Sequence, residues 1–298
     1  MIRAIILGIV QGLTEFLPVS SSGHLVVIPY LLSWEQPPLS FGVAVHFGSL
    51  LAVLAYFAGD LWFLATRTFG IGASGPEEVK RARTTVMLLV IGTLPAAVLG
   101  ATLESQFEKT FEDPRFAASF LLVTAILLWL AETIRRRRVA AREGVTVKEV
   151  TAAQELDDPG RHEGTTTITD AIAIGFAQAM AILPGISRAG ATMATGMMRG
   201  LSREGAARFS FLLSIPIILG ATAFEYPDFS TSGLEGTMYG GWALVAGMAA
   251  AAVSGFWAIR YLLRLVADND LLGFARYVAF FGILTWVGYL WLGPPSQV

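Results

Sequence analysis

Long apolar runs recur at intervals along the whole chain. Six of them have, or nearly have, the about 20 helical residues that are needed to cross a bilayer. They cover residues 41–58, 84–101, 117–134, 206–224, 239–263 and 274–292. The pattern therefore predicts six transmembrane helices in an all-α polytopic membrane protein.

Two further apolar regions, residues 2–32 and 170–199, are each interrupted near the middle by Pro, Ser and Gly. Each half is too short to cross a bilayer alone. Two short limbs that enter and leave by the same side form a re-entrant hairpin, which is tolerated at membrane depth only when it is buried in protein or lines a wet cavity. We expect two such hairpins, with a functional site where they break.

Charge placement predicts the orientation, because cytoplasmic loops carry the excess of Lys and Arg. With three spans after each hairpin, one side collects most of the basic residues: Arg67, Lys80, Arg81, Arg83, Arg135–Arg138, Arg142, Lys148, Arg161, Arg199, Arg203, Arg208, Arg260, Arg264 and Arg276. The other side receives Arg3, Lys109 and Arg115 only. That side also collects acidic residues: Glu35, Glu104, Glu108, Glu112, Asp113, Glu225, Asp228 and Glu235. We expect both termini to lie outside, on this second side.

The two halves of the chain share one layout, a hairpin followed by three spans. Residues 1–134 form the first expected repeat, residues 170–298 form the second, and the polar stretch 135–169 is a cytoplasmic linker. The hairpins align without a gap over Gly8–Gly23 and Gly175–Gly190, and the identities include Gln11 with Gln178, Ser20 with Ser187, and Gly23 with Gly190. Because the hairpins begin on opposite sides, we expect an inverted-topology repeat.

Composition supports a membrane protein: 54% of the 298 residues are hydrophobic and 15% are charged, and the mean hydropathy is +0.60. Bilayer lipid is the expected surrounding, with no nucleic-acid partner. The chain has no Cys, so a metal would need oxygen or imidazole ligands. No small-residue cleavage site follows the first apolar run, so we expect residue 1 to be that of the mature chain.

The stretch QGLTEFLPVSSSGH gathers polar side chains inside the first hairpin. Gln11 and Glu15 are four residues apart and share one helix face, and Pro18 interrupts that helix. The serines that follow suit a turn and a helix N-cap, and a helix N-terminus presents free N–H groups to an anion. The segment PGISRAGAT repeats this arrangement in the second hairpin and adds Arg188.

We expect the two breaks to meet at the membrane midplane and to bind a phosphate-like anion. Arg188 suits phosphate oxygens, and hydroxyls and helix-start amides would complete the cradle; the expected substrate-binding residues are Ser20, Ser22, Ser187, Gly190 and Thr192. Glu15, together with Gln11, predicts Mg²⁺ or a similar hard ion such as Ca²⁺, because a bare carboxylate would repel phosphate. Ser21 and His24 suit a nucleophile and a proton acceptor. The expected catalytic residues are Glu15, Ser21, His24 and Arg188.

The remaining histidines are interpreted as structural. His46 lies in VAVHFGSL, where it would border a cavity lined by the hairpins, and His162 lies in the linker. The run Arg135–Arg138 is interpreted as an anchor at the membrane surface.

The two motifs resemble those of the undecaprenyl-diphosphatases, a family also called bacitracin resistance proteins. The family pattern (E/Q)xxxE followed by PVSSSGH matches Gln11–Glu15 and Pro18–His24, and PGxSRSGxT matches Pro184–Thr192. The resemblance implies metal-dependent hydrolysis of undecaprenyl diphosphate, a phosphoric anhydride, to the monophosphate and inorganic phosphate. This reaction recycles the lipid carrier for peptidoglycan synthesis in the bacterial inner membrane and confers bacitracin resistance. The resemblance also implies a homodimer and an outward-facing site.

The resemblance assigns roles to the matching residues of this chain. Gln11 and Glu15 belong to the metal-associated motif, Ser21 and His24 to the catalytic centre, and Ser187, Arg188 and Thr192 to diphosphate binding. Gln11 stands where the family often has a second Glu, which puts a direct metal bond from this weaker ligand in doubt. Ala189 replaces the usual serine, so that hydroxyl is not required here.

Alternatives remain at two levels. The nucleophile is Ser21, His24 or an activated water. The alternative function is a transporter or flippase of a polyprenyl phosphate lipid, because inverted repeats with broken helices are typical of transporters. A second family of membrane phosphatases, with PSGH-type and SRx5H motifs, fits less well, because no His follows Arg188 at the required distance and the chain has no K-x6-RP pattern.

Overall fold

The computed structural model describes residues 1–107, 113–150, 160–231 and 238–294, and within these the side chains of all but 103–107 and 224–231. The described part is helical, with one isolated β-bridge between Arg161 and Leu201. Its helices are α1 (Ile2–Phe16), α2 (Ser21–Leu31), α3 (Leu39–Tyr56), α4 (Ala58–Thr68), α5 (Pro76–Phe107), α6 (Pro114–Glu143), the 3₁₀ turn η2 (Glu163–Thr165), α8 (Ile168–Met180), α9 (Arg188–Met198), α10 (Arg203–Thr231), α11 (Trp242–Asp268) and α12 (Leu272–Leu292).

The prediction of six spans is confirmed. Within the described residues, six helices are long and apolar enough to cross a membrane, and each overlaps one predicted run: α3, α5, α6, α10, α11 and α12. The predicted linker 135–169 begins inside α6, which continues to Glu143. Arg and Ala are strong helix formers, and they carry α6 onward until Gly144 ends it with a left-handed φ of 68°. The separate helix α4 was not predicted.

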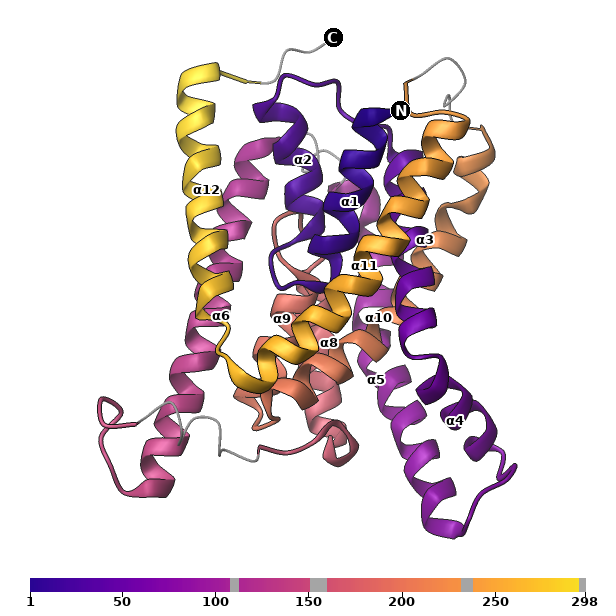
Figure 1. Ribbon diagram of the computed structural model, residues 1–298, viewed down its shortest axis with the longest axis vertical. Coiled ribbons are helices and arrows are strands. Elements are labelled where there is room, and N and C mark those ends of the chain that lie inside the picture. The colour runs from indigo at the N-terminus through magenta and orange to yellow at the C-terminus, as the bar shows by residue number, and fades with distance from the viewer. Residues whose placement is uncertain (108–112, 151–159, 232–237, 295–298) are drawn as a thin grey trace.

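Some of the charges used to predict orientation fall outside the described residues. Lys109, Glu108, Glu112 and Glu235 lie in the undescribed segments, and the side chains of Glu104, Glu225 and Asp228 are not described. The remaining outer-side charges are Arg3, Glu35, Asp113 and Arg115. Arg3 lies near the start of α1, Glu35 lies between α2 and α3, and Asp113 and Arg115 lie at the start of α6. These ends of the helices lie toward the top of Figure 1.

The two hairpins start from opposite ends of the molecule (Figure 1). Helix α1 descends from the end that holds both termini and α2 returns to it, whereas α8 and α9 lie in the other half. The turns between α4 and α5 and between α11 and α12 also lie at that other end, which we call the arginine-rich end because of the basic residues Arg67, Arg81, Arg83 and Arg135–Arg138.

Close glycine contacts hold each hairpin against a long helix of the opposite half of the chain. Helix α1 packs along α11, where a Cβ added at Gly8 would fall 2.2 Å from the Gly247 carbonyl oxygen. Helix α8 packs along α5, where a Cβ added at Gly175 would fall 2.6 Å from the Gly92 carbonyl oxygen. Backbone therefore touches backbone at both places, and only glycine fits.

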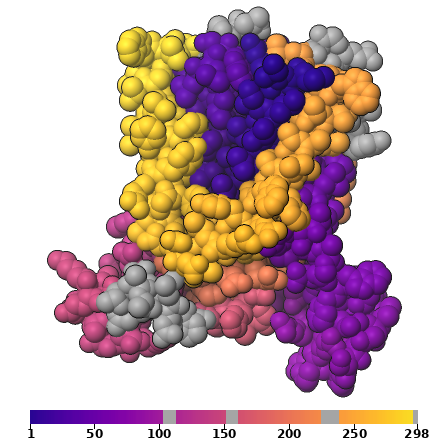
Figure 2. Space-filling view, in the orientation of Figure 1, coloured from indigo at the N-terminus to yellow at the C-terminus, as the bar shows by residue number. Residues whose placement is uncertain are grey.

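The first hairpin is visible from outside between α11 and α12 (Figure 2). Exposed apolar side chains on α1 include Ile2, Ile6, Ile9 and Leu13. Such a surface suits contact with lipid rather than water. At the inner end of α1, Phe16 is fully buried and packs edge-on against Phe211 of α10, with 5.6 Å between ring centroids. This contact fixes the place of the neighbouring Glu15.

Candidate active site

The first hairpin turns sharply between α1 and α2. Leu17 is extended, and Ser20 has a positive φ of 71°, which is unusual for a residue with a side chain. Such a conformation costs on the order of 1–3 kcal/mol and persists where the surroundings fix it. Ser20 is the N-cap of α2, and its Oγ accepts a hydrogen bond from Gly23 N at 3.3 Å.

The second hairpin turns in a related way. Ser187, which aligns with Ser20, is the N-cap of α9, and its Oγ accepts from Gly190 N at 3.0 Å. Gly185 has a φ of 100°, and a Cβ there would fall 2.3 Å from the Ala117 carbonyl oxygen of α6. Thr124 of α6 donates to the Gly185 carbonyl and accepts from Ser187 N, both at 2.9 Å. Helix α6 thus clamps this turn.

The two hairpins meet through an ion pair. Arg188 Nη2 donates to Glu15 Oε1 at 2.8 Å, and Arg188 Nη1 donates to the Ser210 carbonyl of α10 at 3.2 Å. Glu15 is 7% exposed and the Arg188 side chain 12%. The structure therefore brings together the carboxylate of one motif and the guanidinium of the other, 173 positions apart in the sequence.

The second oxygen of Glu15 is surrounded by three further side chains. Ser21 Oγ donates to Glu15 Oε2 at 2.6 Å and Gln11 Nε2 donates to it at 3.0 Å. His46 Nε2 of α3 lies 3.6 Å from the same oxygen. Because the Ser21 hydroxyl already points its proton at a carboxylate, Glu15 can accept that proton directly.

The two ring nitrogens of His24 contact groups other than the Ser21 hydroxyl, its predicted partner. Its Nδ1 lies 2.7 Å from the Ser20 carbonyl, and its Nε2 lies 2.8 Å from the Tyr277 hydroxyl of α12. The ring also stacks on Phe281, with 4.4 Å between centroids. The rings of α12 therefore hold the imidazole by stacking and by a contact with a phenol hydroxyl.

The other predicted substrate-binding residues lie around the ion pair. The Thr192 hydroxyl is 2.6 Å from Ser210 Oγ and 2.7 Å from the Arg188 carbonyl, so it joins α9 to α10 beside Arg188. Ser22 Oγ lies 3.3 Å from Ser20 Oγ. The Ser20 and Ser187 hydroxyls and the Gly190 amide are engaged in the two helix caps described above.

Sequence reasoning missed several residues of this site. His46 was interpreted as structural, but it lies against Glu15; an ionisable residue within an apolar span was the available signal. Ser210, Thr124 and Tyr277 carry no such signal, because hydroxyls within membrane helices usually serve packing or backbone contacts.

The donor atoms around Glu15 fit a hard divalent cation that is shared with a phosphorylated substrate. Gln11 is fully buried, yet its Oε1 has no hydrogen-bond partner. Within the described residues, no group of three or more His, Cys, Asp and Glu side chains is placed to hold a metal. The remaining ligands would have to come from amide and substrate oxygens, which Mg²⁺ and Ca²⁺ accept.

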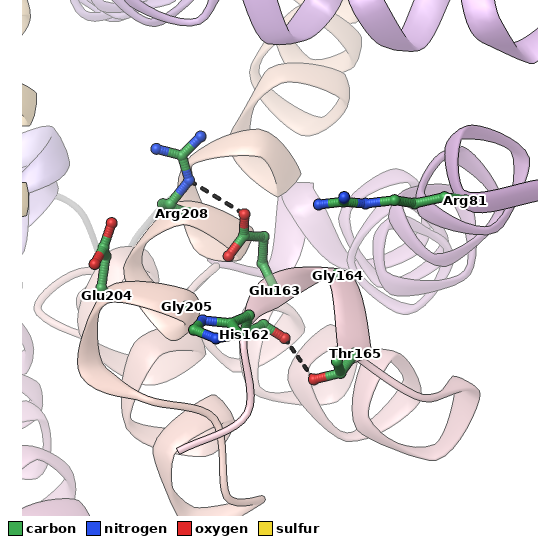
Figure 3. A pocket seen from close by; sticks show the side chains of 8 residues that line it. All are labelled: Arg81, His162, Glu163, Gly164, Thr165, Glu204, Gly205 and Arg208. Carbon is green, nitrogen blue, oxygen red and sulfur yellow. Dashed lines mark hydrogen bonds and ion pairs between the residues drawn. The ribbon is translucent and has the colours of Figure 1, made fainter. Parts of the chain in front are cut away.

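A cavity of about 630 Å³ opens elsewhere, at the arginine-rich end (Figure 3). It is lined by Arg81, His162, Glu163, Gly164, Thr165, Glu204, Gly205 and Arg208. Arg208 pairs with Glu163 at 3.3 Å and with Asp60 at 3.1 Å, so carboxylates already balance its charge. None of the predicted site residues lines this cavity, and we do not assign the phosphate site to it.

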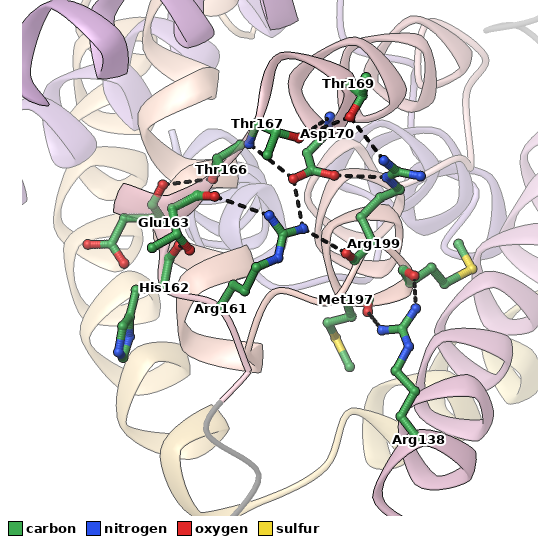
Figure 4. A network of polar contacts seen from close by, with 12 residues as sticks. Arg138, Arg161, His162, Glu163, Thr166, Thr167, Thr169, Asp170, Met197 and Arg199 are labelled. Atoms are coloured by element: carbon green, nitrogen blue, oxygen red, sulfur yellow. Dashed lines mark hydrogen bonds and ion pairs between the residues drawn. The ribbon is translucent and has the colours of Figure 1, made fainter. Parts of the chain in front are cut away.

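A polar network anchors the second hairpin at the arginine-rich end (Figure 4). Asp170 and Thr167 form a capping box at the start of α8. Asp170 also pairs with Arg161 at 2.7 Å and with Arg199, which follows α9, at 2.9 Å. Burial would raise the pKa of Asp170, but the hydrogen bonds from Thr167 and the two guanidiniums lower that pKa to about 2. Both limbs of the hairpin are therefore tied to one carboxylate.

Comparison with known proteins connects the whole chain to one group. The family model described as bacitracin resistance protein BacA matches residues 4–284. The chain is 36% identical over 292 residues to an undecaprenyl-diphosphatase of Moorella thermoacetica, with 98% of each chain covered. It is 41% identical over 282 residues to an undecaprenyl-diphosphatase of Gemmatimonas aurantiaca, with 95% of each covered. It is 37% identical over 278 residues to undecaprenyl-diphosphatase 2 of Stutzerimonas stutzeri, with 93% of this chain and 94% of that protein covered.

Proposed function

The chain belongs to the bacitracin resistance protein family, and from this premise we propose that it hydrolyses undecaprenyl diphosphate to undecaprenyl phosphate and inorganic phosphate. The observation that carries the proposal is the 2.8 Å contact between Arg188 and Glu15, which joins a phosphate-binding group to a carboxylate and hydroxyl pair. The product would return to peptidoglycan synthesis as lipid carrier, and its recycling would confer bacitracin resistance. The transporter alternative is not favoured, since the relatives are named as diphosphatases.

In the proposed reaction, Arg188 binds oxygens of the terminal phosphate with its planar fork. Ser21 Oγ attacks that phosphorus while its proton passes to Glu15 Oε2, 2.6 Å away. A bond forms between Oγ and phosphorus, and the bond from phosphorus to the bridging oxygen breaks, which releases undecaprenyl phosphate. Water then cleaves the phosphoserine to give inorganic phosphate. A divalent cation held by Glu15 and Gln11 Oε1 would, when bound, neutralise charge on the diphosphate.

His24 positions the start of α2 in this mechanism rather than taking the proton. Its two ring nitrogens are engaged by Ser20 and Tyr277. Protein quenched in SDS at mildly alkaline pH, where both phosphoserine and phosphohistidine survive, should therefore carry phosphate on Ser21. Phosphate mapped to His24 would replace the serine route with direct attack by the imidazole, and absence of any phosphoenzyme would favour activated water.

The function is tested by phosphate release from undecaprenyl diphosphate by the purified protein in detergent, with and without Mg²⁺. Detergent removes sidedness, so a transporter without hydrolytic activity would release none. We expect release by the wild type and a loss of at least about 100-fold in Arg188→Ala and Ser21→Ala, since both act on the transition state. Wild-type protein that releases no phosphate under either condition would overturn the proposal.

We also propose that both hairpins are re-entrant and that residues 1–134 and 170–298 form an inverted repeat joined by the linker 135–169. Two pairs of equivalent contacts support this. The aligned residues Gly8 and Gly175 each touch a glycine of the opposite half, and the aligned Ser20 and Ser187 each cap the second limb of a hairpin.

The proposed location is the bacterial inner membrane, with the arginine-rich end in the cytoplasm, both termini outside, and a site that opens outward. The positive-inside distribution of Lys and Arg supports the orientation, and the family resemblance supports the outward opening of the site. The homodimer that the family resemblance implies stays a prediction, which light scattering of the protein in nanodiscs would test.

A further inference from the structure

His46 presents its Nε2 ring nitrogen to the Glu15 carboxylate. Its Nδ1 lies 2.8 Å from the Gly42 carbonyl oxygen, and since a carbonyl only accepts, Nδ1 carries the proton. In the neutral ring, Nε2 then holds a lone pair, and this atom lies 3.6 Å from Glu15 Oε2. In the neutral ring, two atoms with lone pairs face each other at a separation that leaves room for a cation bound to both.

Gln11 adds a third donor to the same place. It is fully buried, and its Nε2 lies 3.0 Å from Glu15 Oε2 while its Oε1 has no partner. The two amide atoms are bonded to one carbon, so Oε1 lies immediately beside this contact. Rotation of the amide by half a turn exchanges the two atoms with almost no change of shape, and it would direct the oxygen toward Glu15 Oε2.

The positive charge already present in the site, the Arg188 guanidinium, contacts the other oxygen of the Glu15 carboxylate. Arg188 binds Glu15 Oε1 and the Ser210 carbonyl, so it is not placed between His46 and Oε2. The His46 side chain is 36% exposed, which gives an ion a route to the three donors.

We propose that His46 Nε2 is a ligand of the divalent cation at Glu15, with Gln11 Oε1 as the third protein donor. The inference deepens the proposed function and rests on it. Metal bonds of about 2.0–2.2 Å place neighbouring ligands roughly 3.0–3.6 Å apart, and the separations of 3.0 and 3.6 Å fall in this range. Because imidazole suits first-row transition ions whereas Ca²⁺ takes oxygen ligands, the site selects Mn²⁺ over Ca²⁺.

The probe is Mn²⁺ added to full-length protein purified in detergent through a tag without histidine. Electron spin echo modulation of bound Mn²⁺ detects a coordinated ¹⁴N directly, and an EPR titration gives the Mn²⁺ dissociation constant. Wild type is compared with His46→Gln, which keeps a polar side chain of similar reach. The matched control is His162→Gln, a histidine of the cavity at the arginine-rich end.

We expect ¹⁴N modulation in wild type and in His162→Gln and its loss in His46→Gln. The Mn²⁺ dissociation constant of His46→Gln should rise about tenfold, which is the lower end of the loss of affinity seen when the surroundings of a metal are perturbed. The Ca²⁺ dissociation constant of the same variant should change less than twofold, which corresponds to about 0.4 kcal/mol. Absence of ¹⁴N modulation in wild type, or its persistence in His46→Gln, would overturn the assignment. Phosphate release by the same wild-type preparation separates this failure from failure of the proposed function.

Discussion

Two ion pairs in the interior of the described part of the molecule join elements that are distant in the sequence. Arg188 and Glu15 connect the two hairpins. Glu132 of α6 and Arg203 of α10 form a second, almost fully buried pair, with contacts of 2.9 and 2.7 Å. Glu132 also accepts from Leu271 N at 2.9 Å, just before α12. Three helices therefore depend on one carboxylate.

Substitution of Glu132 tests that dependence. Glu132→Gln removes the carboxylate charge that Arg203 binds at 2.9 and 2.7 Å, and breaking a buried ion pair typically costs about 3–5 kcal/mol. We expect a large fall in the unfolding temperature in detergent. The control is Glu143→Gln, whose partner Arg142 is 49% exposed; such a surface pair contributes about 0–1 kcal/mol. Equal unfolding temperatures for the two variants would contradict the expectation.

At the scale of elements, the hairpins depend on glycine for their approach to α11 and α5. The contact between Gly8 and Gly247 leaves no room for a methyl group, because the obstructing atom belongs to the backbone. Overpacking of this kind typically costs about 1–3 kcal/mol, and it would displace α1, which carries Gln11 and Glu15.

Gly8→Ala should therefore lower both the unfolding temperature and the rate of phosphate release. The matched control is Gly100→Ala in α5, where an added Cβ has no atom within 4 Å. Alanine is a better helix former than glycine by about 0.8–1.0 kcal/mol, so the control should be neutral or more stable. A Gly8→Ala protein as stable and active as wild type would contradict this expectation, because it would show that α1 and α11 can move apart without loss of stability.

The anchor of the second hairpin predicts a pH dependence. The pKa of Asp170 is lowered from 3.8 to about 2 in the folded protein. A depressed folded pKa contributes stability that is present above the unfolded pKa and is lost as the pH falls through the folded value. Asp170→Asn should therefore unfold at a lower temperature than wild type near neutral pH, and the difference should shrink between about pH 4 and pH 2. A constant difference across that range would argue against the carboxylate charge as its source.

At the scale of the molecule, the orientation can be read by labelling, because the chain has no Cys. Glu35→Cys lies toward the end that carries both termini, and Ser74→Cys lies at the arginine-rich end, near the start of α5. In intact cells, a membrane-impermeant maleimide should label the first variant and spare the second, and permeabilised cells should label both. The reverse pattern would invert the proposed orientation.

The spans were predictable because length and hydropathy alone determine them, and the turns were predictable because Pro18 and the aligned serines interrupt apolar runs. The direction of the His24 ring was not, because its partner Tyr277 lies 253 positions away. His46 was expected to border the cavity, but its contact with Glu15 was not predicted, because the side of α3 that faces α1 is known only from the packed structure. Local pattern therefore predicted where the chain turns, and tertiary contacts decided which atoms meet.

The ion pair between the hairpins also has a consequence for biogenesis. Glu15 leaves the ribosome 173 residues before Arg188, so the first half enters the membrane with a carboxylate that has no guanidinium to hold it. The nascent chain has no complete phosphate site until the second hairpin has inserted. A chain whose synthesis stops before Arg188 is therefore expected to be inactive. Activity begins only once α8, α9 and α10 have packed against the earlier helices.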